Sequence, residues 1–232
     1  KRYLKELVPT EIDDLIAMNS LYRPGPMEYI PQFIKGKHDP TSVKYVHDSL
    51  KPILKKTHGV AVYQEQIMQL AQSFSGMSLG DAYILLKGIG KKRSSIVKKM
   101  RQQFTEGAMK KGHDERFAND VFEKVIEPFA GYGFNKSHAA CYSWIAYQTA
   151  YLKAHYPAEF MAALLSSDPD NTDKVVIGIN ECEAMGIKVL PPNINTSLAH
   201  FTVIDEKTIS FGLTAIKGLG EASAREFIEV RG

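Results

Sequence analysis

The feature that most constrains the fold is a helical spacing of apolar residues that recurs from Ile67 to Met185. Apolar side chains return every three or four residues, so each segment can bury one face against a neighbour. Breakers separate the segments, since Gly112 follows one of them and Pro157 stops another. We therefore expect an essentially all-α chain up to residue 186. The expected buried faces are Ile67, Leu70, Ala71 and Phe74; Ile96, Met100 and Phe104; and Phe117, Val121, Phe122 and Val125.

Capping residues place the ends of individual helices. Thr10, with Asp13 three residues later, predicts the start of a helix that runs to about Asn19. Ser78 predicts the start of another helix, which we expect to end at Leu86. The segment 60–63 is short and apolar, and it predicts either a strand or a first helical turn. Further helices are expected over residues 137–156, over 173–185 with Thr172 as cap, and over 222–230.

The pattern changes after Leu190. Residues 200–204 and 208–211 alternate apolar and polar side chains around Asp205-Glu206-Lys207, which is typical of a β-hairpin. A glycine-rich turn at residues 216–221 follows, and the last expected helix comes after it. We therefore place a domain boundary near Leu190. The expected fold is mainly α, with a short β-hairpin near the end.

Composition excludes several classes of protein. The 232 residues are 44% hydrophobic, which is enough to bury a substantial core. Cys141 and Cys182 are too few and too far apart for a disulfide framework or a zinc site, and they fit the reduced thiols of a cytoplasmic protein. No apolar run reaches the roughly 20 residues that a membrane span needs, and no signal peptide is visible. We expect no membrane partner.

Positive charge is concentrated in one stretch, although the net charge of +3 is mild. No acidic residue occurs between Ala82 and Thr105, where seven lysines and arginines fall. Such a run forms either a solvated helix face or an anion-binding surface. The glycines within it resemble a nucleotide P-loop, but Leu85 and Lys92 stand where that motif needs Gly and Ser or Thr. The sequence therefore excludes an ATPase of the P-loop class.

Residues 129–138 (FAGYGFNKSH) form a second candidate anion site. Gly131 and Gly133 allow close approach of a partner, and the following helix start provides free backbone amides. A bend that only joins two helices explains the same glycines, and His138 can equally pack against Tyr142. The residues alone leave both interpretations open.

No acidic pair fits a two-metal catalytic site. The candidates are Asp13-Asp14 on an early helix, Asp168-Pro169-Asp170 in a polar turn and Asp205-Glu206 in the hairpin turn. We therefore assign no catalytic and no metal-binding residue to this chain. Glu65 is expected to hydrogen-bond neighbouring loops, and Arg23 to bind either a phosphate or a carboxylate within the fold.

Four segments of the chain, in the same order, resemble the bacterial DNA polymerase III α subunits, which are the C-family replicative polymerases. These segments are residues 21–27 (LYRPGPM), 62–69 (VYQEQIMQ), 131–165 (GYGFNKSHAACYSWIAYQTAYLKAHYPAEFMAALL) and 216–221 (IKGLGE). The resemblance implies a helical fingers domain over residues 1–190. It also implies that residues 191–232 are the truncated start of a helix-hairpin-helix DNA-binding module.

This resemblance implies a fragment of a DNA-directed DNA polymerase that binds the triphosphate of the incoming deoxynucleotide and contacts the DNA backbone. The catalytic carboxylates of the palm and the Mg²⁺ that they hold are expected outside this chain, so the isolated fragment is expected to be inactive. The expected partners are primer-template DNA, deoxynucleoside triphosphates and, through regions outside this chain, other replicase subunits including the sliding clamp. The alternative is a stand-alone, sequence-independent DNA-binding module without a nucleotide role.

The resemblance also carries roles to individual residues. Nucleotide binding is implied for Lys87, Lys91, Lys92, Asn135, Lys136, Ser137 and His138, with Ser137 expected to cap the helix that follows. DNA binding is implied for Arg93, Lys217, Gly218, Leu219 and Gly220. One departure stands out, because Leu86-Lys87 occupies the place of an arginine pair in the family. A lysine offers a point charge and not a bidentate fork, so another cation is expected to compensate.

Overall fold

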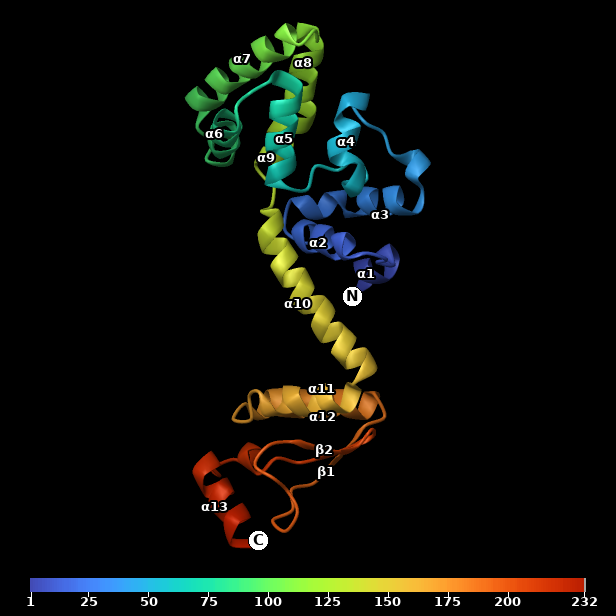
Figure 1. The fold of residues 1–232 in the computed structure, drawn as a ribbon, viewed down its shortest axis with the longest axis vertical. Coiled ribbons are helices and arrows are strands. Elements are labelled where there is room, and N and C mark those ends of the chain that lie inside the picture. The colour runs from blue at the N-terminus through green and yellow to red at the C-terminus, as the bar shows by residue number, and fades with distance from the viewer. Residues whose placement is uncertain (232) are drawn as a thin grey trace. The chain divides into compact units, whose positions relative to one another are not determined.

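The computed structural model describes residues 1–231. These residues form two compact units, the first Lys1–Ile145 and the second from Ala146 onward. The mainly α fold with a small sheet near the C-terminus is confirmed (Figure 1). The predicted boundary near Leu190 falls inside the second unit, because the strand that ends there pairs with a later strand. The assignment of residues 1–190 and 191–232 to two functional domains stays a prediction.

The first unit is built from helices joined by short turns. Its helices are α1 (Arg2–Leu7), α2 (Ile12–Leu21), α3 (Ile30–His38), α4 (Lys51–Leu54), α5 (Gln64–Ser75), α6 (Leu79–Gly90), α7 (Ser94–Lys110), α8 (Glu115–Val121), α9 (Glu127–Ala130) and the start of α10 (Lys136–His155). Residues 26–29, 40–42, 48–50 and 55–57 form 3-10 turns, and a π turn at residues 122–126 joins α8 to α9.

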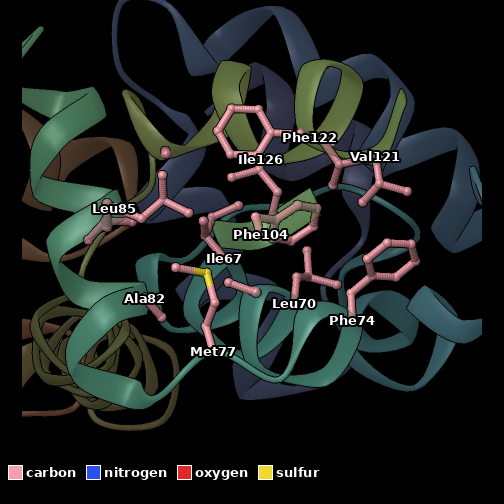
Figure 2. Packing of buried hydrophobic residues seen from close by; sticks show 14 of the residues in the cluster. Ile67, Leu70, Phe74, Met77, Ala82, Leu85, Phe104, Val121, Phe122 and Ile126 are labelled. Carbon is pink, nitrogen blue, oxygen red and sulfur yellow. The ribbon is translucent and has the colours of Figure 1, made fainter. Parts of the chain in front are cut away.

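The larger core of this unit is formed mainly by α5 to α9, with Leu50, Leu54 and Ala61 from the segment before α5 (Figure 2). The three apolar faces expected from the sequence meet there: Ile67 and Phe74 from α5, Phe104 from α7, and Phe122 from the π turn are all buried. The rings of Phe74 and Phe104 stack with their centroids 5.6 Å apart. Ile96 and Phe117, at the edges of the predicted faces, are only partly buried against this core.

A second core packs α1 to α3 against the segment that precedes α5. Residues 60–63 do not form the expected first helical turn, and of the expected strand they form only an isolated bridge at Tyr63. Tyr63 pairs with Phe134 in a parallel bridge, in which Phe134 N–H donates to the Val62 carbonyl at 3.1 Å and Gln64 N–H to that of Phe134 at 3.0 Å. This bridge places the start of α10 beside the start of α5.

Several helix ends differ from those predicted. Helix α2 begins after Glu11 and not after Thr10, because the Asp14 carboxylate accepts the backbone amides of both residues at 3.2 and 2.9 Å. Helix α6 starts at its Ser78 cap as predicted but continues past Leu86 to Gly90. Asn171, and not Thr172, caps α12 (Thr172–Ala184).

The second unit places two helices on a three-stranded sheet of order β1-β3-β2. The predicted hairpin is confirmed, with β2 (Thr202–Asp205) antiparallel to β3 (Thr208–Ser210). The sequence did not predict β1 (Lys188–Leu190), which runs parallel to β3. The helices are α11 (Pro157–Ser166) and α12, and Met161, Cys182 and Ile209 are buried between them and the sheet. A 3-10 turn at residues 213–215 and α13 (Glu221–Arg231) follow.

Candidate functional site

The loop between α9 and α10, residues 131–135, is held in place by Arg23. The Arg23 guanidinium donates from Nη2 to the Tyr132 carbonyl and from Nε to the Ser20 carbonyl, both at 2.8 Å, and lies 4.3 Å from the centre of the Phe134 ring. Burial lowers the pKa of Arg23. Among the described residues Arg23 contacts carbonyl oxygens and not a carboxylate, and binding of a phosphate by Arg23 stays a prediction. Its role in the fold is to hold this loop through carbonyl oxygens.

The first amides of α10 already have partners within the fold. The Glu65 carboxylate accepts the Lys136 backbone amide at 3.1 and 3.2 Å, so the expectation that Glu65 hydrogen-bonds a neighbouring loop is confirmed. The Asn135 Oδ1 accepts the His138 amide at 2.9 Å and the Ser137 hydroxyl at 2.6 Å. Asn135 therefore caps the helix, and the prediction of Ser137 as the cap is wrong. An anion at this end of α10 would be bound mainly by side chains.

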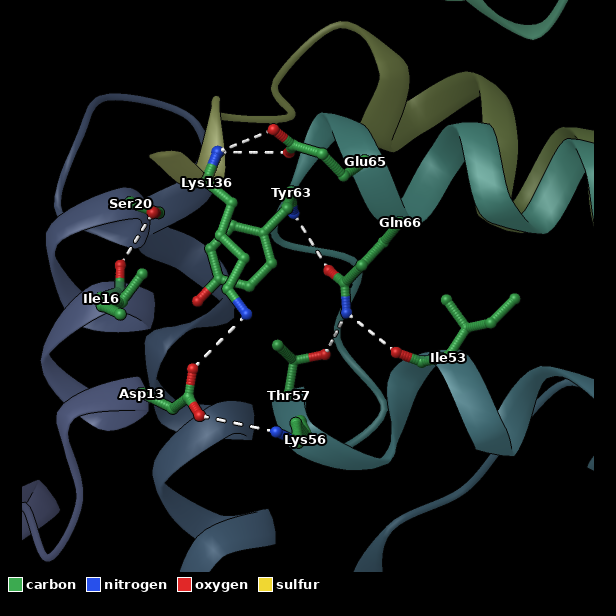
Figure 3. Close-up of polar contacts among 10 residues, drawn as sticks. All are labelled: Asp13, Ile16, Ser20, Ile53, Lys56, Thr57, Tyr63, Glu65, Gln66 and Lys136. Carbon is green, nitrogen blue, oxygen red and sulfur yellow. Dashed lines mark hydrogen bonds and ion pairs between the residues drawn. The ribbon is translucent and has the colours of Figure 1, made fainter. Parts of the chain in front are cut away.

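The side chain of Lys136 turns toward α2 (Figure 3). Its Nζ lies 3.4 Å from Oδ1 of Asp13 and 5.3 Å from the centre of the Tyr63 ring. Burial, together with the carboxylates of Asp13, Glu65 and Asp14, raises the pKa of the Tyr63 phenol. Lys136 is 40% exposed and Asp13 28% exposed, so this ion pair is within reach of an incoming anion.

His138 is exposed and packs its ring against two aromatic neighbours. Its ring centroid lies 4.8 Å from that of Tyr142 and 5.4 Å from that of Phe134. The packing interpretation of His138 therefore describes the structure. The exposed ring is still accessible to an anion, so nucleotide binding by His138 stays a prediction.

The basic turn between α6 and α7 presents side-chain cations and not backbone amides. The amides of Lys91, Lys92 and Arg93 donate to the carbonyls of Lys87, Ile89 and Gly88 at 2.9 to 3.0 Å. This arrangement leaves those amides unavailable to cradle a phosphate, which agrees with the exclusion of a P-loop. The side chains of Lys87, Lys91, Lys92 and Arg93 are exposed, whereas Leu86 is buried in the larger core.

The structure brings this basic turn beside the loop before α10, although about forty residues separate them in the sequence. Helix α6 packs against α9, and a Cβ added at Gly90 would lie 3.9 Å from the carbonyl oxygen of Ala130. The Lys87 Nζ lies 5.2 Å from the centre of the Tyr83 ring on the same helix. Two predicted halves of one anion site therefore occupy adjacent positions in the first unit.

The glycine-rich turn before α13 presents an open backbone. Gly218 has a φ of +88°, whereas Gly220 does not adopt the left-handed conformation. A Cβ added at either glycine would meet nothing within 4 Å, so a backbone phosphate can approach the turn. Lys217 is exposed, and the Glu221 carboxylate is paired with Arg225, whose Nε lies 3.0 Å away. This pairing lowers the pKa of Glu221 and compensates its negative charge.

Neither a metal centre nor a membrane span is found within residues 1–231. These residues contain no group of three or more His, Cys, Asp or Glu side chains that could hold a metal ion. The carboxylates near the loop before α10, Asp13 and Glu65, are bound to a lysine and to a backbone amide. They do not fit a two-metal site. None of the helices in the described part is long and apolar enough to cross a bilayer.

Comparison with known proteins gives two family matches. Residues 1–112 match the finger domain of the bacterial DNA polymerase III alpha subunit, and residues 186–232 match a helix-hairpin-helix motif. The chain is 52% identical over 220 residues to DNA polymerase III subunit alpha of Borreliella burgdorferi. It is 48% identical over 238 residues to that of Escherichia coli K12, and 49% identical over 233 residues to that of Thermus aquaticus. These alignments cover 95–100% of the chain but only 19–20% of each relative.

Proposed function

Because the chain belongs to the family of bacterial DNA polymerase III alpha subunits, we propose that it binds the incoming nucleotide and the DNA backbone for a DNA-directed DNA polymerase. The chain spans about a fifth of the length of the curated relatives it matches. The proposed substrates are deoxynucleoside triphosphates and primer-template DNA. Contacts with other replicase subunits, including the sliding clamp, are assigned to regions outside this chain.

One observation carries the nucleotide part of this proposal. The exposed lysines of the turn between α6 and α7 lie beside the loop that leads to Lys136 and His138, because α6 packs on α9. Several cations on adjacent, well-packed elements suit a triphosphate, which carries several negative charges. Lys91, Lys92 and Lys136 compensate for the arginine pair that Leu86-Lys87 replaces.

The chemistry of phosphodiester formation is assigned outside this chain. That reaction uses divalent metals held by carboxylates, and residues 1–231 contain no side-chain cluster that could hold one. The role of this chain is to bind and orient the triphosphate. We therefore expect the isolated chain to give no primer extension with Mg²⁺ and all four nucleotides, and template-dependent extension would refute this assignment.

The DNA part of the proposal depends on the turn before α13. The match to a helix-hairpin-helix motif and the open backbone at Gly218 and Gly220 favour contact with a backbone phosphate. Such a contact reads no sequence, so affinity is expected to be similar for unrelated duplexes. The slope of log affinity against log salt is expected to be about −1 for each phosphate contact that is made.

A pair of double substitutions in the full-length enzyme tests the nucleotide part. Replacing Lys91 and Lys92 by Ala removes two cations that each contribute about 0.5–1.5 kcal/mol, so the apparent KM for nucleotides should rise at least several-fold. The matched control replaces Lys98 and Lys99, which are exposed further along α7. The control should leave KM unchanged. An equal effect of both pairs, or an effect on primer-template affinity alone, would contradict the nucleotide assignment.

A further inference from the structure

We propose that Lys56 and Lys136 together form a phosphate subsite, and that Asp13 is the internal counter-ion that a phosphate displaces. The inference rests on the proposed function, since it names the place where one phosphate of the nucleotide binds. Lys56 was not among the residues that the sequence indicated. Lys56 belongs to this subsite only because the fold brings three segments that are distant in the sequence together.

The geometry joins one carboxylate to two ammonium groups (Figure 3). Oδ1 of Asp13 lies 3.4 Å from the Lys136 Nζ, and Oδ2 lies 3.7 Å from the Lys56 Nζ. Asp13 is in the first turn of α2, Lys56 in the 3-10 turn at residues 55–57, and Lys136 at the start of α10. The two lysines therefore converge on one small acceptor, as they would on a phosphate group.

The backbone beneath both lysines is rigidly held. The backbone amide of Lys136 donates a hydrogen bond to the Glu65 carboxylate, and Thr57, the residue after Lys56, is held by a buried network. In that network the Gln66 Nε2 donates to the Thr57 hydroxyl at 2.8 Å and to the Ile53 carbonyl at 3.1 Å. Only the flexible ends of the lysines have to move when a ligand binds. A pre-organised pair of cations loses little freedom on binding.

Charge and exposure favour exchange of the counter-ion. One carboxylate faces two ammonium groups, so the three side chains leave one positive charge uncompensated. The side chain of Lys56 is 79% exposed and that of Lys136 40%, and ion pairs at such positions contribute little. A phosphate offers more charge and more acceptor oxygens than a carboxylate, so it binds the same two cations more strongly.

The neighbouring acidic groups do not compete for these lysines. The Asp14 carboxylate is 2.7 Å from the Lys37 Nζ and accepts the backbone amides of Thr10 and Glu11, just before α2. The Glu65 carboxylate accepts the Lys136 amide and not its ammonium group. Asp13 is therefore the carboxylate that sets the affinity of the two lysines for an anion.

The test uses the full-length polymerase with two opposite substitutions. Asp13→Asn keeps the shape of the side chain but removes its charge, so we expect the apparent KM for nucleotides to fall two- to fivefold. Lys56→Ala should raise KM by a similar factor, while the control Lys55→Ala, at the neighbouring exposed lysine, should not change it. Inorganic tripolyphosphate, used as a competitive inhibitor, should bind more tightly to Asp13→Asn and more weakly to Lys56→Ala.

The source of the phosphate is separated by measuring primer-template affinity for the same variants. Changes in this affinity, with KM unchanged, would keep the subsite but assign it to the DNA backbone. If neither quantity responds to Asp13→Asn and Lys56→Ala while Lys136→Ala still raises KM, the subsite is refuted and the proposed function stands. If Lys136→Ala and the Lys91, Lys92 double variant also leave KM unchanged, the proposed function itself fails.

Discussion

The crossing of α5 and α7 makes Gly107 a position where the smallest possible side chain is destabilising. A Cβ added there would lie 2.1 Å from the carbonyl oxygen of Ser75, which is backbone and cannot rotate away. An ordinary contact needs about 3.4 Å or more, so α7 would have to move by more than one ångström. That movement would also separate the stacked rings of Phe74 and Phe104.

The expected magnitude combines two opposing effects. Overpacking of this kind costs about 1–3 kcal/mol and sometimes more, while the better helix propensity of Ala returns up to about 1 kcal/mol. Because the clash is with backbone, we expect the upper end, a net loss of about 2 kcal/mol for Gly107→Ala. For a unit of this size that is a fall in Tm of about 4–8 °C.

The control is Gly80→Ala in α6, where the added Cβ meets only the Ser78 hydroxyl, at 3.7 Å. That variant should be unchanged or more stable by up to about 1 kcal/mol. The assay is thermal and urea denaturation of both variants followed by circular dichroism. If Gly107→Ala is as stable as Gly80→Ala, the close approach of α5 and α7 is not a feature of the folded protein.

Three further perturbations follow from the same reasoning. Gln66→Ala should lower the free energy of unfolding by about 2–4 kcal/mol, because it leaves two buried backbone amides without their acceptor; urea denaturation measures this. Burial raises the pKa of Asp14, but bonds from Lys37 and two backbone amides outweigh it and hold the pKa below its ordinary value. The stability that Asp14 contributes is therefore present above pH about 4 and is lost as the pH falls through its lowered pKa, so acid denaturation curves of Asp14→Asn should be flatter. Gly218→Ala should cost about 1 kcal/mol or more because of its positive φ, whereas Gly220→Ala should be tolerated, and a reversed order in thermal denaturation would contradict the turn geometry.

Local chemistry made the helices predictable. The faces built on Ile67 and Phe104 are buried as their spacing indicated, and α10 begins and ends within one residue of the prediction. The hairpin of β2 and β3 was visible because alternation and turn residues are local signals. Strand β1 was missed because its three residues are recognisable only through their parallel pairing with β3.

The helix caps show where local sequence patterns fail to predict a helix boundary. Thr10 and Thr172 have the right chemistry for caps, yet Glu11 and Asn171 begin those helices. Capping preferences among Ser, Thr, Asp and Asn differ by little, so the sequence does not decide between Asn171 and Thr172. Glu11 is not a preferred cap residue, and it precedes α2 because the Asp14 carboxylate accepts its amide and that of Thr10. The same holds at Ser137. Asn135, two residues earlier, caps α10 because its side-chain oxygen accepts the His138 backbone amide.

The sequence by itself determined the mainly α class, the apolar faces and the clustering of basic residues, because each depends on neighbours within a few positions. Only the tertiary structure decided what those residues contact. Glu65 accepts the first amide of α10, Arg23 holds the loop before it, and Asp13 joins Lys56 to Lys136. Such pairings span tens of residues in the chain, and no local pattern specifies them. They exist because packing of the two apolar cores brings α2, α5 and α10 together.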